Sequence, residues 1–178
     1  MKIGLFGIGL ETYWPQFDGL LSRLKGYQQQ IKTRIEEMGV TVIDAGMVDN
    51  PDKARLAADY LREEKVDIAF LYISTYALSS TVLPIAQQIK VPVIVLNVQP
   101  VAAIDYDKLN SMGDRGDMTG EWLAHCQACS VPEVACIFNR SGIQYDIVSG
   151  HLHDQETWNE IKEWVDAAYV LYALNHSR

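Results

Sequence analysis

The stretch 66-VDIAFLYIS-74 decides the fold class, because almost all of its side chains are apolar. A strand that is covered on one face alternates apolar and polar residues, whereas a continuous apolar run is typical of a parallel strand covered by helices on both faces. The stretches 2-KIGLFG-7, 40-VTVIDAG-46, 91-VPVIVLN-97 and 145-YDIVSG-150 predict four further strands. The sequence therefore predicts a five-stranded parallel sheet.

Segments with helical spacing separate these strands. Apolar residues recur at three and four positions between Pro15 and Met38, and Gly39 is expected to end this first helix. Asn50 followed by Pro51 predicts the start of a second helix over 51–64. Further helices are expected over 78–90, over 118–128, over 130–142 with Ser130 and Glu133 as a capping box, and after Asp154. The stretch 99–117 is expected to be an irregular loop.

Alternating strands and helices predict a three-layer α/β domain of the flavodoxin-like or Rossmann-like type. Right-handed crossovers favour the strand order 2-1-3-4-5. With 178 residues and no linker or internal repeat, we expect a single domain over residues 1–178.

Composition excludes several function classes. The formal net charge is -8 and no cluster of Lys or Arg occurs, so a nucleic acid partner is not expected. No apolar run reaches the roughly 18 residues of a membrane span. The short apolar stretch at the N-terminus fits a first strand better than a signal peptide. We therefore expect a cytoplasmic protein without a membrane partner.

The three cysteines are Cys126, Cys129 and Cys136. The first two form a C-x2-C pair, which is compatible with zinc binding or with a redox motif. A structural zinc site needs four ligands, and this stretch lies within a helical pattern. We expect buried, reduced thiols, which also fits the odd number of cysteines.

A ligand site is expected where the strands end. In this fold ligands bind beyond the carboxyl ends of the strands, at the switch point between the first and third strands. The segment 5-LFGIGLETYWPQF-17 leaves the first strand there and carries Glu11, Tyr13 and Trp14. The aromatic residues could instead simply cover the first helix, and a polar residue is common at a strand end.

The residues at this edge favour an uncharged ligand. The G-x-G in 7-GIGLET-12 lacks the third glycine of a dinucleotide site, and Glu11 would repel a pyrophosphate. Aromatic faces can cover the C–H surfaces of a polyol while carboxylates and amides pair with its hydroxyls. No pairing of nucleophile and base is recognisable, so no catalytic residue is assigned.

Three segments together resemble the N-terminal domain of the L-arabinose/L-fucose isomerase superfamily, closest to arabinose isomerase-like proteins. They are the turn after the first strand, 109-LNSMGDRGDMTGEW-122 and 145-YDIVSGHLHDQETWNEIKEWV-165. The resemblance implies the N-terminal domain of a longer, multidomain sugar isomerase, an intramolecular oxidoreductase that converts aldose to ketose. It further implies a divalent cation, commonly Mn2+, whose ligands lie outside this chain, so that this part alone is inactive.

The same resemblance implies a role in substrate contact and assembly. Its partners would be the sugar, the C-terminal domains and a neighbouring subunit of a homo-oligomer that completes the active site. Glu11 and Asp114 replace a Gln and a His of the arabinose isomerases, which favours a different sugar. The substrate-binding residues expected on this basis are Glu11, Tyr13, Trp14, Asn110, Ser111 and Asp114.

Two further observations bear on partners and on alternatives. In the last helix Trp158, Trp164, Tyr169 and Tyr172 cannot all point inward, so part of its surface is expected to be covered by another domain or subunit. The alternative to an isomerase domain is a stand-alone flavodoxin-like domain that binds or senses a small polar ligand without catalysis.

Overall fold

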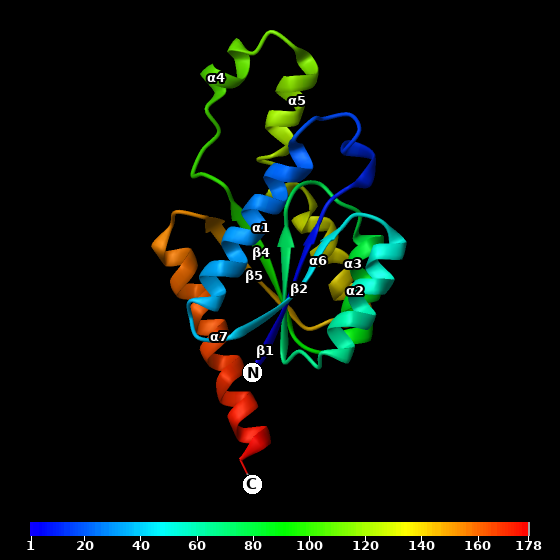
Figure 1. Cartoon of the computed structure of the whole chain (residues 1–178), viewed down its shortest axis with the longest axis vertical. Coiled ribbons are helices and arrows are strands. Elements are labelled where there is room, and N and C mark those ends of the chain that lie inside the picture. The colour runs from blue at the N-terminus through cyan, green and yellow to red at the C-terminus, as the bar shows by residue number, and fades with distance from the viewer. Residues whose placement is uncertain (178) are drawn as a thin grey trace.

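The structure is a computed structural model that describes residues 1–177. Five parallel strands form one sheet in the order β2-β1-β3-β4-β5, with helices on both faces (Figure 1). The predicted three-layer, flavodoxin-like architecture is therefore confirmed. The strands are β1 (Lys2–Ile8), β2 (Thr41–Val48), β3 (Ile68–Ile73), β4 (Val93–Gln99) and β5 (Tyr145–His151).

Seven α-helices and two short 3-10 helices occur among residues 1–177. The α-helices are α1 (Leu20–Glu36), α2 (Pro51–Glu63), α3 (Ser79–Ile89), α4 (Tyr106–Ser111), α5 (Arg115–Leu123), α6 (Val131–Ser141) and α7 (Gln155–His176). The 3-10 helices are η1 (Glu11–Tyr13) and η2 (Gln127–Ser130).

The core has two layers because the central strands are apolar on both faces. Every residue of β3 is buried, as the run at 66–74 predicts. Helices α2, α3 and α6 pack on one face of the sheet through small and aliphatic residues. Helices α1 and α7 pack on the other, where Trp158 is the largest side chain that α7 contributes. Figure 1 shows these two helix layers on either side of the sheet.

Local signals set several helix ends as expected. The Asn50 side chain accepts a hydrogen bond from the Lys53 backbone N–H at 2.9 Å, which starts α2. Asp154 accepts from the backbone N–H groups of Glu156 and Thr157 and starts α7. Gly142 ends α6 with a φ of +66°, a conformation that glycine adopts without strain.

The first helix begins later than expected. Pro15 does not open it; residues 11–17 form η1 and a turn, and Gly19, with a φ of +76°, directly precedes α1. The Trp14 indole N–H donates to Asp49 at the end of β2, at 2.7 Å. Because this contact holds the chain over the end of the sheet, the helix starts only after the turn.

The stretch 99–117 is less irregular than predicted. It contains the short helix α4 and the start of α5, whose N-caps are Asp105 and Asp114. The helix expected over 118–128 is likewise two elements, since α5 ends at Leu123 and η2 follows. Ser130 occupies the N-cap position of α6, but the predicted capping box does not form: its hydroxyl is bonded to the backbone of Ala77, and Glu133 accepts from the backbone N–H of Ser79.

Helix α7 runs past the amino ends of the strands, so that its last turns lie below the sheet in Figure 1. Trp158 is buried and Trp164 is half-buried, while four apolar residues of its last part are more than half exposed: Tyr169, Val170, Leu171 and Leu174. The expectation that not all aromatic residues of this helix point inward is thus met. Within residues 1–177, no helix has the length and apolar character needed to cross a membrane.

Candidate functional site

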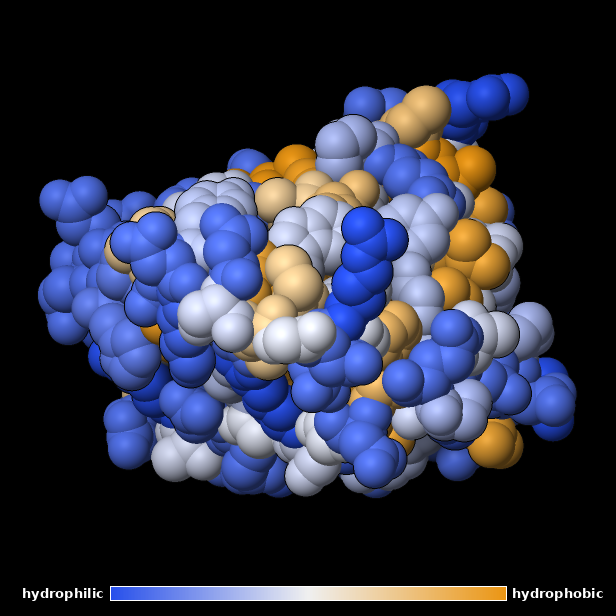
Figure 2. Space-filling model, turned by 90° about the horizontal axis from the view of Figure 1, so that it is seen from above, coloured by the Kyte–Doolittle hydropathy of each residue, from blue (hydrophilic) through white to orange (hydrophobic). Residues whose placement is uncertain are grey.

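A third, smaller cluster of apolar residues lies at the carboxyl end of the sheet. Leu20 and Leu24 of α1 pack there against Met47 and Leu123, with Phe17 at its edge. A hollow of about 620 Å³ opens beside this cluster, between the turn that precedes α1 and the segment that carries α5. Figure 2 shows this end of the molecule from above, with hydrophilic residues over most of it and small hydrophobic patches between them. We call this hollow the α1–α5 groove.

Two glycines shape the groove. Gly19 takes up the positive φ that turns the chain into α1, so that Phe17 lies on the wall. Gly120 faces Phe17 from α5, where a Cβ atom would contact the aromatic ring at 3.4 Å. A methyl group at Gly120 would therefore make an ordinary van der Waals contact with Phe17, which places α5 directly beside the ring.

Carboxylates dominate the polar part of the groove. Asp114 starts α5, with its side chain accepting from the backbone N–H of Asp117 at 3.0 Å. Asp114, Asp117 and Asp18 are exposed residues of the lining. Their remaining oxygen lone pairs can accept hydrogen bonds from a ligand.

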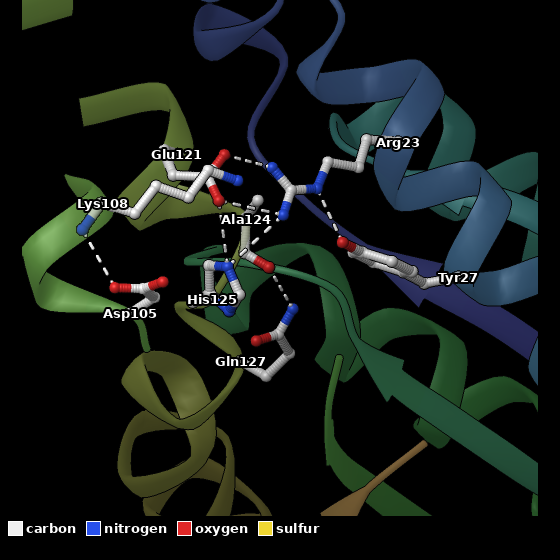
Figure 3. A network of polar contacts seen from close by, with 8 residues as sticks. All are labelled: Arg23, Tyr27, Asp105, Lys108, Glu121, Ala124, His125 and Gln127. Carbon is white, nitrogen blue, oxygen red and sulfur yellow. Dashed lines mark hydrogen bonds and ion pairs between the residues drawn. The ribbon is translucent and has the colours of Figure 1, made fainter. Parts of the chain in front are cut away.

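One ion pair joins the two walls. Arg23 of α1 donates to both carboxylate oxygens of Glu121 on α5, at 2.5 and 3.2 Å, and its Nε donates to the Tyr27 hydroxyl at 2.6 Å (Figure 3). The hydrogen bonds from Arg23 lower the pKa of the Glu121 carboxyl, although partial burial opposes them. The same contact raises the pKa of Arg23. Arg23 is the sole cationic residue among those that line the groove.

His125 extends this network below the ion pair. Its Nε2 lies 3.3 Å from both Glu121 Oε1 and Arg23 Nη2. A second hollow of about 260 Å³ lies on this side, with Asp105 and Lys108 of the α4 region on its far wall. Figure 3 shows the ion pair between α1 and α5, with His125 beneath it. Arg23 and Glu121 thus separate two hollows.

Beside the predicted crevice, the ends of β3 and β4 are covered by the segment that follows α5. Gln127 of η2 is fully buried, and its amide donates to the backbone oxygens of Ser74 and Ala124, each at 2.9 Å. Thr75 donates to the backbone oxygen of Leu123 at 2.7 Å. Because this segment packs over the ends of β3 and β4, the open space lies farther out, between α1 and α5.

Of the six predicted site residues, only Asp114 lines the groove. Glu11 is exposed and accepts a hydrogen bond from the Asn50 side chain at the end of β2. Asn110 and Ser111 are exposed on α4, where the Ser111 hydroxyl donates to the backbone oxygen of Lys108. The structure therefore does not gather these residues into one cavity.

The two aromatic residues of the set have structural contacts. The Trp14 ring lies so close to Gly9 that a Cβ atom there would be 2.8 Å from it, and its N–H is used by Asp49. Tyr13 packs edge-on against Phe17, with ring centroids 5.9 Å apart, and partial burial raises its pKa. These contacts agree with the alternative in which both residues cover the start of the first helix.

The sequence reasoning missed Phe17, Arg23 and Glu121 as groove residues. Phe17 was assigned to the buried face of a helix that in fact begins three residues later. Arg23 and Glu121 carry no local signal, because their contact joins positions that are 98 residues apart. The acidic residues around 114–117 were a usable signal, but they fit a solvated loop equally well.

The cysteines differ from expectation. Cys126 and Cys129 form a disulfide rather than two reduced thiols, and only Cys126 of the pair is buried. Cys136 is a free cysteine and is exposed. Cys126 and Cys129 lie close together in the turn between α5 and α6, whereas the sequence pattern predicted a continuous helix there.

The described residues contain no group of three or more His, Cys, Asp or Glu side chains that could hold a metal ion. His151 and His153 are separated by one residue, and the backbone N–H of His153 donates to the imidazole Nδ1 of His151 at 3.3 Å. The expected Mn2+ ligands were assigned to other domains, so this finding does not test them.

Comparisons with known proteins give no family. No family model matches the chain, and no curated protein matches it. Among solved structures, a protein from Bacteroides fragilis described as a "putative acylhydrolase" matches with a TM-score of 0.47 and 9% identity, over 94% of this chain and 85% of its own. The expected membership of the L-arabinose/L-fucose isomerase superfamily is therefore wrong, since none of these comparisons finds it.

Proposed function

We propose that this chain binds a small, uncharged, polyhydroxylated ligand, a sugar or a polyol, in the α1–α5 groove, and that it does so without catalysis. The observation that carries the proposal is the ion pair between Arg23 and Glu121. The sole cation of the lining is held by both oxygens of Glu121, so the charged side chains that remain for a ligand are carboxylates. The other polar side chain of the lining, Gln16, already donates its amide N–H to the backbone oxygen of Thr12.

This set of groups suits hydroxyls better than anions. A phosphate or carboxylate ligand would face Asp18, Asp114 and Asp117 with no free cation to pair with, and like charges repel. Hydroxyl groups can donate to the same oxygens. The Phe17 ring offers an apolar surface for the C–H face of a sugar. A hollow of about 620 Å³ falls within the range of small-molecule sites.

The prediction of a metal-dependent sugar isomerase, with Mn2+, further domains and a homo-oligomer, no longer has a family resemblance behind it, and neither its activity nor its partners are tested by these observations. A cytoplasmic location likewise stays a prediction. The binding proposal depends on neither.

A ligand panel tests the proposal. Saturation-transfer NMR and calorimetry should compare neutral pentoses, hexoses and deoxyhexoses with sugar phosphates and amino sugars at physiological salt. We expect binding of at least one neutral sugar, and no preference for its phosphorylated form. Preferential binding of a phosphorylated or an amino sugar would contradict the proposed ligand class.

Two variants connect binding to the groove. Phe17→Ala should weaken binding about fivefold, since an aromatic contact contributes roughly 1 kcal/mol. Asp114→Asn keeps a good N-cap but removes the charge, and should also weaken binding while α5 stays folded. Tyr60→Ala, an exposed aromatic residue of α2, is the matched control and should leave the affinity unchanged. If the affinity for the sugar is unchanged in both groove variants, the site lies elsewhere.

A further inference from the structure

The disulfide between Cys126 and Cys129 lies in the short segment that joins α5 to α6. Cys126 is 2% exposed, whereas Cys129 is an exposed residue. A reagent in solution can therefore approach the bond from the side of Cys129. The C-x2-C spacing is that of many dithiol–disulfide sites.

The fold does not need this bond to hold the segment. Ser130 both accepts from the Ala77 N–H, at 2.7 Å, and donates to the Ala77 oxygen, at 3.1 Å. Thr75 and Gln127 add the bonds to the backbone described above. These hydrogen bonds attach the segment to the loop after β3 at Leu123, Gln127 and Ser130, so it stays docked when the bond opens, while the bond itself restrains the residues between these points.

The bond also contributes little by chain entropy. A cross-link stabilises a protein mainly by restricting the unfolded chain, and the effect grows with the length of the closed loop. Here the two cysteines are only three positions apart. Reduction should therefore leave the protein folded, which is the condition for a bond that opens and closes in the native state.

We propose that Cys126 and Cys129 form a reversible dithiol–disulfide site whose exchange partner is a dithiol, and that its redox state controls the α1–α5 groove. The second half of this proposal rests on the proposed function. The first half, the exchange site itself, stands independently of what the groove binds.

The exchange follows the usual two steps. A thiolate of the partner dithiol attacks the sulfur of Cys129, a partner–Cys129 disulfide forms, and the Cys126 sulfur leaves as a thiolate and takes up a proton. The second thiolate of the partner then attacks the partner's first sulfur, which is bonded to Cys129 in the mixed disulfide. The disulfide of the partner forms, and the Cys129 sulfur leaves as a thiolate and takes up a proton. The chain gains two electrons and two protons, and the partner is oxidised to its disulfide.

The link to the groove runs through α5. This helix supplies Gly120 and Glu121 to the lining and ends at Leu123, three residues before the bond. Between them His125 contacts both members of the Arg23–Glu121 pair. Opening the bond removes a covalent restraint on the residue next to His125, so the end of α5 becomes more mobile and the groove less well formed.

A thiol count tests the exchange site. The protein should be equilibrated in mixtures of reduced and oxidised dithiothreitol, and free thiols labelled with a maleimide and counted by mass. We expect the wild type to change from one label to three in a single reversible transition, because the exposed Cys136 reacts in both states. Cys136→Ser should change from none to two. Circular dichroism should show the same fold throughout.

Two results would overturn the exchange site. One is labelling of Cys126 and Cys129 only after unfolding in denaturant, which would make the bond purely structural. The other is a failure of the reduced, folded protein to reform the bond in oxidised dithiothreitol.

Hydrogen exchange tests the control of the groove. We expect amides in residues 118–130 to exchange several-fold faster in the reduced protein, while those of α2 do not change. In the double variant Cys126→Ser/Cys129→Ser, these amides should exchange as fast as in the reduced wild type, and dithiothreitol should not change their rates. Equal exchange in both states would refute the link between the bond and α5.

The affinity for a bound neutral sugar should fall several-fold on reduction in the wild type and should not respond in the double serine variant. An equal affinity in both states would overturn control of the groove. If no sugar binds in either redox state, the binding proposal fails. The thiol count and hydrogen exchange still test the exchange site and its link to α5.

Discussion

Arg23 and Glu121 lie 98 positions apart in the sequence, yet the guanidinium of one contacts both carboxylate oxygens of the other, at 2.5 and 3.2 Å. Their side chains are 35% and 21% exposed, so the pair is neither free in solvent nor enclosed in the core. It joins α1 to α5 across the groove, and it removes the cation that an anionic ligand would need.

This ion pair should give the stability a defined pH dependence. Because Arg23 lowers the folded-state pKa of Glu121 below the ordinary value of 4.5, the contribution is complete above that value and is lost as the pH falls through the folded-state pKa. Glu121→Gln should cost roughly 1 kcal/mol at pH 7, and the two proteins should converge in acid. Urea unfolding between pH 7 and pH 3 measures both.

The control for this prediction is the exposed pair of Lys162 and Asp166 on α7. Asp166→Asn should change the free energy of unfolding at pH 7 by less than about 0.5 kcal/mol. A penalty for Glu121→Gln that stays constant down to pH 3 would mean that the charge of Glu121 is not what stabilises the contact.

Trp14 should act on stability rather than on ligand binding. Its N–H donates to Asp49, whose side chain has no exposed surface, and Trp14→Phe removes that donor. Loss of a hydrogen bond to a buried carboxylate costs about 1–3 kcal/mol. Trp122→Phe, on the exposed surface of α5, should cost less than about 0.5 kcal/mol. Sugar affinity lost in Trp14→Phe without loss of stability would instead make Trp14 a ligand contact.

Gly9 and Gly26 offer a matched pair of substitutions. A Cβ atom at Gly9 would lie 2.8 Å from the Trp14 ring, so Gly9→Ala should destabilise the protein by roughly 1–3 kcal/mol. Gly26 lies within α1 with nothing inside 4 Å of the same atom, and Gly26→Ala should stabilise by about 0.5–1 kcal/mol. Thermal unfolding of both variants shows whether each substitution raises or lowers the stability. Equal shifts would contradict the close packing of Trp14 on Gly9.

Ser130 should be important for the attachment of η2 rather than for the start of α6. Ser130→Ala leaves both the N–H and the oxygen of Ala77 without their buried partner, which should cost about 1–3 kcal/mol. Ser111→Ala removes an exposed hydroxyl and should change stability by less than about 0.5 kcal/mol. Chemical denaturation compares the two. A neutral Ser130→Ala would show that the segment is held by other contacts.

Much of the fold could be predicted because its signals are local. The apolar run of β3, the Asn50 and Asp154 caps and the Gly142 stop each act through neighbours a few residues away. Helix α4 and the first residues of α5 were missed since Asp, Asn, Ser and Gly have low helix propensity, and here two Asp caps and tertiary packing outweigh it.

The candidate site was much harder to predict. Asp114 was predicted from a family resemblance that is itself wrong, and Phe17 and Arg23, which lie opposite it in the groove, come from a distant part of the sequence. Trp14 was misassigned because its partner Asp49 lies 35 positions away. The sequence predicted a ligand site at the switch point, since no local pattern shows that Gln127 packs over the end of β3.

By itself, the sequence determined the parallel sheet, its strand order and most helix ends, because apolar periodicity and capping depend on residues that are close along the chain. Only the tertiary structure decided that Arg23 meets Glu121, that Cys126 is bonded to Cys129 and that the open space lies between α1 and α5. Those contacts depend on how η2 and α5 pack over the ends of the strands. That packing is set by the summed interactions of distant segments, which no local pattern encodes.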